Sequence, residues 1–162
     1  MHRGRKASCA VFSAVALAAL LQGSALAQGE DLLELLRSDL KTEKVALLTE
    51  AMEFSSQQAE VFWPIYREYD LELSKLGDSR IALIKDYAAN YESMTDAKAK
   101  ELVQKTFKLE GEVLKLQEKY YQKVEKALSS TEAARFIQVE RQIRLLLDVQ
   151  IAAQIPLVKK SM

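Results

Sequence analysis

The chain has 162 residues, with 23 Lys or Arg against 23 Asp or Glu, so its formal net charge is zero. Its one histidine, His2, and its one cysteine, Cys9, both lie near the start. Downstream of them, disulfides, a thiol nucleophile, a histidine base and an imidazole or thiolate metal site are excluded. Two prolines and five glycines, among many Leu, Ala, Glu and Lys residues, favour helix.

The first 27 residues have the pattern of a secretory signal peptide. A basic start over 2–6 precedes an apolar run over 7–21, and Ala25-Leu26-Ala27 follows in the Ala-x-Ala arrangement of a cleavage site. The apolar run is shorter than the roughly 20 residues that a membrane-spanning helix needs. We therefore expect cleavage after Ala27, with an uncleaved N-terminal anchor as the less favoured alternative.

Cleavage would change the charge of the exported chain. It removes three basic residues, which leaves 20 basic against 23 acidic side chains and a net charge of about −3. This balance argues against a general binder of nucleic acid or of anionic membranes. We expect neither a nucleic-acid partner nor stable membrane insertion after cleavage.

Residues 28–162 suit a single all-α domain with four helices, over about 30–52, 56–91, 96–127 and 130–154. The first carries a broad leucine-rich face that a polar stretch over 39–43 interrupts. The second contains Pro64, which predicts a kink, and Gly77-Asp78, which predicts a second bend or a break.

The third helix has the most regular pattern in the chain, with Thr95 as its expected N-cap. Its apolar seam alternates steps of three and four, as in a heptad repeat, through Ala99, Leu102, Thr106, Leu109, Val113, Leu116 and Tyr120. The many charged residues on its other faces indicate a solvated surface more than a specific acidic-partner site. The fourth helix should turn Phe136, Val139, Ile143, Leu146 and Leu147 inward, with Ile137, Leu145 and Ile151 on other sides.

Short turns between the last three helices predict antiparallel neighbours. The second and third helices would each be about 50 Å long, which is long for a compact domain of about 135 residues. We therefore expect an elongated, antiparallel four-helix hairpin assembly. The leftover apolar faces predict a dimer about a two-fold axis.

Two matching segments open the second and fourth helices. In each, a serine with Gln or Glu three residues later forms a capping-box pattern, and an apolar residue just before the serine suits a hydrophobic staple. The first copy consists of Phe54, Ser55 and Gln58, and the second of Leu128, Ser129 and Glu132.

These two segments resemble the LTxxQ motif that occurs twice in the Spy/CpxP-like family of periplasmic proteins. Here the copies are Phe54-Ser55-Ser56-Gln57-Gln58 and Leu128-Ser129-Ser130-Thr131-Glu132, with Ser in place of Thr in both, Phe for Leu in the first and Glu for Gln in the second. The resemblance spans nearly the whole exported chain. It implies a periplasmic location and a curved, cradle-like, four-helix dimer.

Members of this family act as ATP-independent holdase chaperones, as accessories of envelope-stress signalling, or as heavy-metal sensors. The resemblance therefore implies a chaperone or stress accessory that binds partly unfolded envelope proteins. A regulatory partner that docks on the outer domain of a membrane sensor is the alternative, and a structural helical oligomerisation module is a second one. Aromatic residues are the possible client-binding set: Trp63, Tyr66, Tyr69, Tyr87, Tyr120 and Tyr121.

The sequence offers little for catalysis or for a cofactor. No pair of carboxylates stands out by its spacing, and a glycine-rich phosphate-binding loop is missing. Met52, Met94 and Met162 are scattered, and carboxylates alone would suit only hard cations weakly. We expect no enzyme activity, no cofactor and no metal site.

Overall fold

The computed structural model describes residues 44–159, and the compact unit considered below begins at Ala46. The expected signal peptide and most of the first expected helix lie outside the described residues. Within 44–159 the regular structure is helical and contains no strand, which confirms the all-α class. Residues 44–52 are helical, and α2 (Ser56–Asn90), the 3-10 helix η1 (Tyr91–Ser93), α3 (Asp96–Ala127) and α4 (Ser130–Gln154) follow. In this part of the chain, helices long and apolar enough to cross a membrane are not found.

Helix α2 begins at the capping box expected from the sequence. The Ser55 hydroxyl accepts the Gln58 N–H at 3.3 Å, and the Gln58 side-chain oxygen accepts the Ser55 N–H at 3.0 Å. Phe54 packs its ring against Phe62 with the centroids 4.7 Å apart. The local sequence thus satisfies free N–H groups at the helix start and fixes the direction in which the chain enters it.

Helix α2 then continues for 35 residues through both Pro64 and Gly77. The break considered at Gly77 is therefore wrong. A glycine inside a helix costs about 1 kcal/mol relative to alanine, and packing on both sides can offset that cost. Leu73 and Leu76, just before the glycine, pack against the hydrophobic core.

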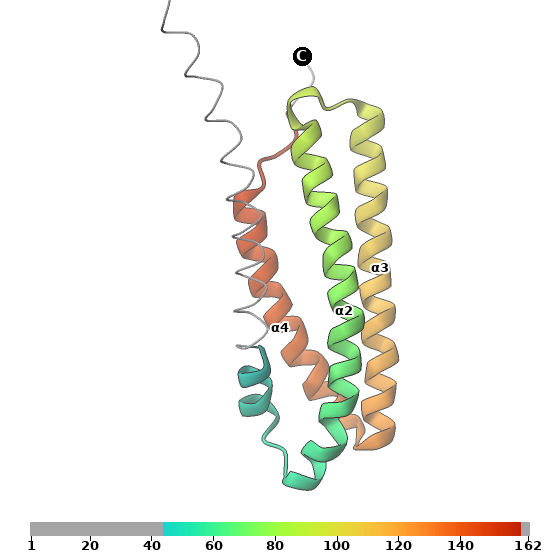
Figure 1. The fold of residues 1–162 in the computed structure, drawn as a ribbon, viewed down its shortest axis with the longest axis vertical. Helices are drawn as coiled ribbons and strands as arrows, with labels where there is room; N and C mark the ends of the chain where they lie inside the picture. The colour runs from blue at the N-terminus through green and yellow to red at the C-terminus, as the bar shows by residue number, and fades with distance from the viewer. Residues whose placement is uncertain (1–43, 160–162) are drawn as a thin grey trace, which may run out of the picture. The chain divides into compact units, whose positions relative to one another are not determined.

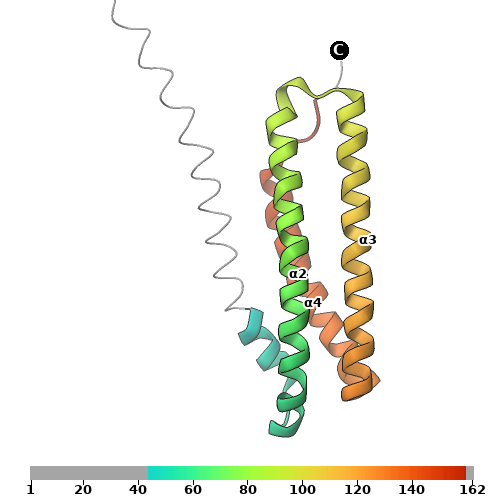
Figure 2. The same cartoon turned by 45° about the vertical axis from the view of Figure 1, so that its right-hand side comes forward.

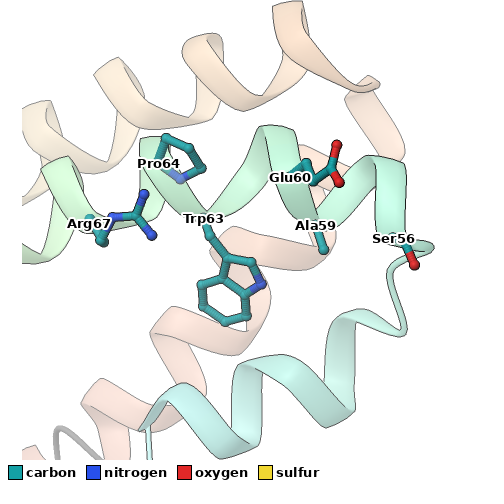
Figure 3. A pocket seen from close by; sticks show the side chains of 6 residues that line it. All are labelled: Ser56, Ala59, Glu60, Trp63, Pro64 and Arg67. Carbon is teal, nitrogen blue, oxygen red and sulfur yellow. The ribbon is translucent and has the colours of Figure 1, made fainter.

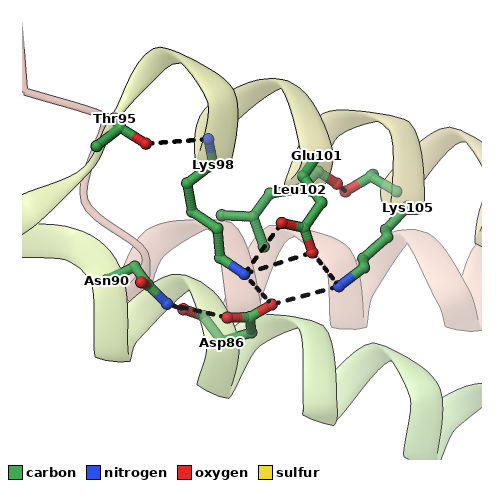
Figure 4. A network of polar contacts seen from close by, with 8 residues as sticks. Asp86, Asn90, Thr95, Lys98, Glu101, Leu102 and Lys105 are labelled. Atoms are coloured by element: carbon green, nitrogen blue, oxygen red, sulfur yellow. Dashed lines mark hydrogen bonds and ion pairs between the residues drawn. The ribbon is translucent and has the colours of Figure 1, made fainter.

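A polar network joins the end of α2 to the start of α3 (Figure 4). Asp86 on α2 accepts hydrogen bonds from Lys98 at 2.8 Å and from Asn90 at 2.9 Å, and Lys105 lies 3.6 Å from the same carboxylate. The Thr95 hydroxyl accepts the Lys98 N–H at 3.2 Å and caps α3. The hydrogen bond from Lys98 is the main reason why the pKa of Asp86 lies below its usual value. This network holds the turn at which the chain reverses.

Helices α2 and α3 run side by side, and α4 crosses behind them at an angle (Figures 1 and 2). The seam of α3 faces inward, and its buried members are Leu102, Leu109, Val113, Leu116, Tyr120 and Val124. Thr106, which the heptad pattern also placed in the seam, is exposed instead. Its hydroxyl donates to the carbonyl of Leu102 at 3.0 Å, which satisfies a polar group at the edge of the seam.

The second capping box forms only in part. The Ser129 hydroxyl accepts the Glu132 N–H at 3.1 Å, so the serine caps α4. The Glu132 side chain does not return the bond, and its buried Oε2 has no hydrogen-bond partner within the described chain. The two copies of the motif are therefore equivalent in position but not in hydrogen bonding.

Helix α4 buries Ala133, Phe136, Glu140 and Ile143. Leu146, which the sequence pattern turned inward, is 64% exposed. Two ion pairs close to Leu146 in α4 explain why it is exposed. Arg144 pairs with Glu110 of α3, and Asp148 pairs with Arg80 of α2. These ion pairs turn the side of the helix that carries Arg144 and Asp148 toward its neighbours and leave Leu146 on another side.

An aromatic core holds one end of the unit together, which we call the base. There the first turns of α2 meet the second half of α3 and the first half of α4, and Leu48 and Met52 of the 44–52 helix join them. Phe62 and Phe136 lie edge to face at 5.4 Å, and Tyr69 meets Phe136 in the same way at 5.3 Å. Edge-to-face rings add about 0.5–1.5 kcal/mol per pair to the burial of their area.

Candidate functional site

Three of the six aromatic residues expected to contact a client lie in this core. Tyr66, Tyr69 and Tyr120 are 3%, 1% and 0% exposed. A client cannot reach these rings while the core is closed, so the structure corrects that assignment. Their helical spacing reflects packing, as aromatic residues at such spacing usually do.

The buried tyrosine hydroxyls have polar neighbours inside the unit. Tyr120 donates to the carboxylate of Glu72 at 2.8 Å, and Lys119 donates to the same carboxylate at 2.7 Å. Burial, and then the hydrogen bond to Glu72, raise the pKa of Tyr120 well above its ordinary value. Burial also raises the pKa of Tyr69, and the nearby Glu140 carboxylate adds to that rise.

Two further candidates, Tyr87 and Tyr121, are half-buried but use their hydroxyls within the fold. Tyr87 donates to the carbonyl of Pro156 at 2.7 Å, which ties the segment after α4 to α2. Tyr121 donates to Glu125 at 2.9 Å, and this hydrogen bond is the first cause of the raised pKa of Tyr121. Tyr87 thus links two segments of the chain, whereas Tyr121 uses its hydroxyl within its own helix, α3.

Trp63 is the candidate that lines an accessible hollow (Figure 3). A shallow groove of about 470 Å³ runs along one face of the first turns of α2. Its lining residues are spaced three or four apart, or share a turn, and they are Ser56, Ala59, Glu60, Trp63, Pro64 and Arg67. We call this feature the Trp63 groove.

The core fixes the position of the tryptophan ring. Trp63 meets Phe62 edge to face at 5.3 Å and Tyr66 edge to face at 5.5 Å. The indole is only partly covered, and Ala59 leaves space beside it because its side chain is a single methyl group. The groove therefore offers a rigid aromatic surface next to a small residue, which suits an apolar side chain.

Two opposite charges flank Trp63 among the residues that line the groove. Glu60 lies one turn before Trp63, and Arg67 lies one turn after it. Neither charge has an ion pair or a hydrogen bond with another residue of the described chain. Both charges are thus available to a bound segment that carries complementary charges on either side of an apolar residue.

The sequence analysis missed the exposed apolar surface of α3. The exposed large apolar side chains include two groups on neighbouring turns of one helix, Val103, Phe107 and Leu114 on α3, and Leu145, Leu146 and Val149 on α4. The sequence analysis placed Leu145 outside the inward face of the fourth helix, but for α3 it named only the apolar residues of the seam. Counting the apolar residues that remain outside the α3 seam would have found Val103, Phe107 and Leu114.

The described residues contain no group of three or more His, Cys, Asp or Glu side chains that could hold a metal ion. Comparison with models of protein families, with curated proteins and with solved structures finds no match. The physical arrangement of the Trp63 groove and the resemblance in the two capping motifs are therefore the basis for the functional proposal.

Proposed function

We propose that this protein is a periplasmic, ATP-independent holdase chaperone or envelope-stress accessory that binds partly unfolded envelope proteins. The observation that carries the proposal is the Trp63 groove, in which a fixed and partly exposed indole lies between unpaired charges of opposite sign. Partly unfolded chains expose apolar side chains among charged ones, so a shallow groove of this kind would accept many sequences. The two capping motifs support the same proposal, because they resemble the motif of the Spy/CpxP-like family. With the chaperone function we also propose the cradle-like dimer that this resemblance implies.

Binding at such a site needs no nucleotide, because burial of apolar area drives it. Removing apolar surface from water yields about 25 cal/mol per Å². Much of this gain is offset by the order imposed on the client, so individual contacts are weak and reversible. Weak, reversible contact delays aggregation without trapping the client.

Suppression of light scattering by a reduced, aggregating client tests the activity. The protein at several-fold molar excess should delay the rise in scattering, and Trp63→Ala should remove most of that effect. Trp63→Phe, which keeps an aromatic ring against Phe62 and Tyr66, should retain more of it. Leu157→Ala, at an exposed position after α4, is the matched control and should act as the unchanged protein does. No delay at any excess, with the protein folded, contradicts the proposal.

The tryptophan itself reports on binding, because Trp63 is the one tryptophan in the chain. Its fluorescence should shift on titration with a peptide that carries an apolar residue between a basic and an acidic one. Arg67→Glu should lower the affinity for this peptide. The same variant should bind more tightly a second peptide, in which the acidic residue is replaced by a basic one. Equal affinity of both peptides for both proteins would show that the groove charges play no part.

A helical oligomerisation module is the second candidate function. The exposed group Val103, Phe107 and Leu114 on α3 favours it, since such stripes often lie at helix contacts. This candidate predicts a fixed stoichiometry with one partner and no effect on unrelated aggregating clients, so the scattering assay separates it from the first.

A further inference from the structure

Pro64 stands where a helix tolerates proline poorly. It lies about two turns after the start of α2 at Ser56, past the first turn in which proline is accepted, and the helix continues through it. Its side chain is exposed, whereas those of Trp63 and Ile65 on either side pack against the core. Proline costs the interior of a helix more stability than any other residue, and burial does not offset that cost at this position. A costly residue with little packing to justify it directs attention to the groove that it lines.

The proline changes the hydrogen bonding of α2 at one carbonyl group. Proline has no N–H, so the bond that would run from residue 64 to the carbonyl of Glu60 cannot form. The Glu60 carbonyl oxygen is therefore an acceptor without its usual helical donor. Glu60 and Pro64 both line the Trp63 groove (Figure 3), so the oxygen between them borders the same hollow. The groove thus adds a main-chain acceptor to its indole and its two charges.

A main-chain acceptor of this kind suits a free main-chain donor. An extended, unpaired chain has N–H groups that its own backbone does not use, whereas the N–H groups of a helix interior or an inner strand are already bonded. Unfolded chains therefore present both groups that the groove can receive, an apolar side chain for Trp63 and an N–H for the Glu60 carbonyl. A folded surface offers exposed apolar side chains, but the N–H groups beside them are mostly bonded.

The two charges of the groove set the length and composition of the bound segment. Glu60 and Arg67 are seven residues apart, or about 10 Å along the helix axis. An extended segment advances about 3.3 Å per residue, so about three steps cover this distance. A basic residue near Glu60, an acidic one near Arg67 and an apolar one between them fit the span.

We propose that the Trp63 groove selects extended, unfolded segments because the Glu60 carbonyl, which Pro64 leaves without its helical donor, accepts a main-chain N–H of the bound segment. The inference rests on the proposed function and names what that function recognises. The ligand is a short extended stretch with a basic, an apolar and an acidic residue, and its free N–H distinguishes it from an apolar patch on a folded protein. Pro64 is a positioning residue, since it acts through the carbonyl of Glu60.

Replacement of single amides by esters in a peptide tests this hydrogen bond, because an ester has an oxygen atom in place of the N–H. A series of peptides carries the basic–apolar–acidic stretch, each with one ester at a different position. In fluorescence anisotropy of the labelled peptides, an ester at one position should raise the dissociation constant about fivefold or more, and esters elsewhere less than about twofold. The other esters are matched controls, because successive N–H groups of an extended chain point in opposite directions.

Pro64→Ala completes the cycle. The alanine N–H can bond to the Glu60 carbonyl within the helix and withdraw that oxygen from the groove. In this variant the sensitive ester should raise the dissociation constant less than about twofold, and the urea midpoint should rise because the helix regains a bond. Val61→Ala, at an exposed position on the same turn and outside the groove lining, keeps the proline and should keep the full effect of the ester.

The inference is supported if the ester weakens binding to the original protein and to Val61→Ala but not to Pro64→Ala. An equal effect of the ester in all three proteins overturns it, and so does a series in which every ester is tolerated. An all-amide peptide that does not bind overturns it as well. The scattering assay with Trp63→Ala decides the proposed function separately, so a groove that holds clients without this hydrogen bond can be recognised.

Discussion

The two ends of the unit are held together in different ways. At the base, Phe62, Tyr69, Tyr120 and Phe136 are almost fully buried and contact one another in a chain of edge-to-face rings. At the far end, where α2 turns into α3 and α4 ends, polar contacts dominate, beside a pair of tilted rings, Tyr87 and Tyr91, whose centroids are 5.8 Å apart. Arg80 of α2 pairs with Asp148 of α4 at 2.6 Å, and both side chains remain about one-third exposed.

This difference indicates where stability resides and where partners can bind. Burial of large apolar side chains contributes more than partly exposed ion pairs, which water and salt weaken. We expect the base to set the free energy of unfolding and the far end to open first. Most of the exposed apolar residues named above, Val103 and Phe107 on α3 and Leu145, Leu146 and Val149 on α4, lie in the half of each helix nearer the far end.

The largest expected effect comes from replacing a large side chain of the aromatic core with alanine. Phe62→Ala or Phe136→Ala should lower the free energy of unfolding by about 3–5 kcal/mol, because each leaves a cavity among packed rings. Phe107→Ala removes the same atoms from an exposed position and should change the monomer by about 0.5 kcal/mol or less. Urea unfolding of dilute, monomeric protein measures all three. Equal losses at Phe62 and Phe107 would contradict the distinction between core and surface.

The second-largest effect is expected at alkaline pH, which should destabilise the aromatic core at the base of the unit. The pKa values of Tyr66, Tyr69 and Tyr120 are raised, first by burial and then by the neighbouring carboxylates Glu140 and Glu72. A raised pKa in the folded state means that stability is fully present below the unfolded value, about pH 10, and is lost as pH rises above it. The urea midpoint should therefore stay level to about pH 9 and fall beyond pH 10.

Tyr120→Phe provides a control for this pH dependence. It removes one ionisable group and should make the alkaline decline shallower. A midpoint that does not change up to pH 11, or that falls already between pH 7 and 9, would contradict the assignment of the decline to buried tyrosines.

Substitutions at the two helix caps should lower the free energy of unfolding by less, and the two caps should differ from each other. Ser55→Ala and Ser129→Ala should each cost about 1 kcal/mol, because each serine accepts one N–H group at a helix start. Gln58→Ala should add a further loss, since its side chain accepts the Ser55 N–H, whereas Glu132→Ala should cost less because it makes no such bond. Equal losses for Gln58→Ala and Glu132→Ala, measured by urea unfolding, would show that the second box closes in solution.

The smallest global effect is expected at the turn between α2 and α3. Asp86→Asn weakens the pairing with Lys98 and Lys105, so amide exchange over about 86–98 should become faster while the urea midpoint hardly moves. The lowered pKa of Asp86 gives the sign for pH. Its contribution is present above the unfolded value, about pH 4, and is lost as pH falls through the folded one. A large drop in the midpoint would mean that the far end shares the cooperative core.

The sequence by itself determined the helices, because their signals are local. The capping serines at 55 and 129 lie directly before α2 and α4, and the seam of α3 from Leu102 to Tyr120 follows from the repeat of the side chains along one helix. A hydrogen bond across three residues and a period of 3.6 need no information about distant parts of the chain.

Only the tertiary structure decided which faces are covered and which remain open. Glu140 is buried beside Tyr69, and Leu146 is exposed on the same helix, although hydropathy alone predicts the reverse. The burial of Tyr66 and Tyr69, and the partial exposure of Trp63, likewise depend on where α3, α4 and the 44–52 helix pack against α2. The sequence names the apolar residues of a helix, but the number and direction of its neighbours determine which of them lose contact with water.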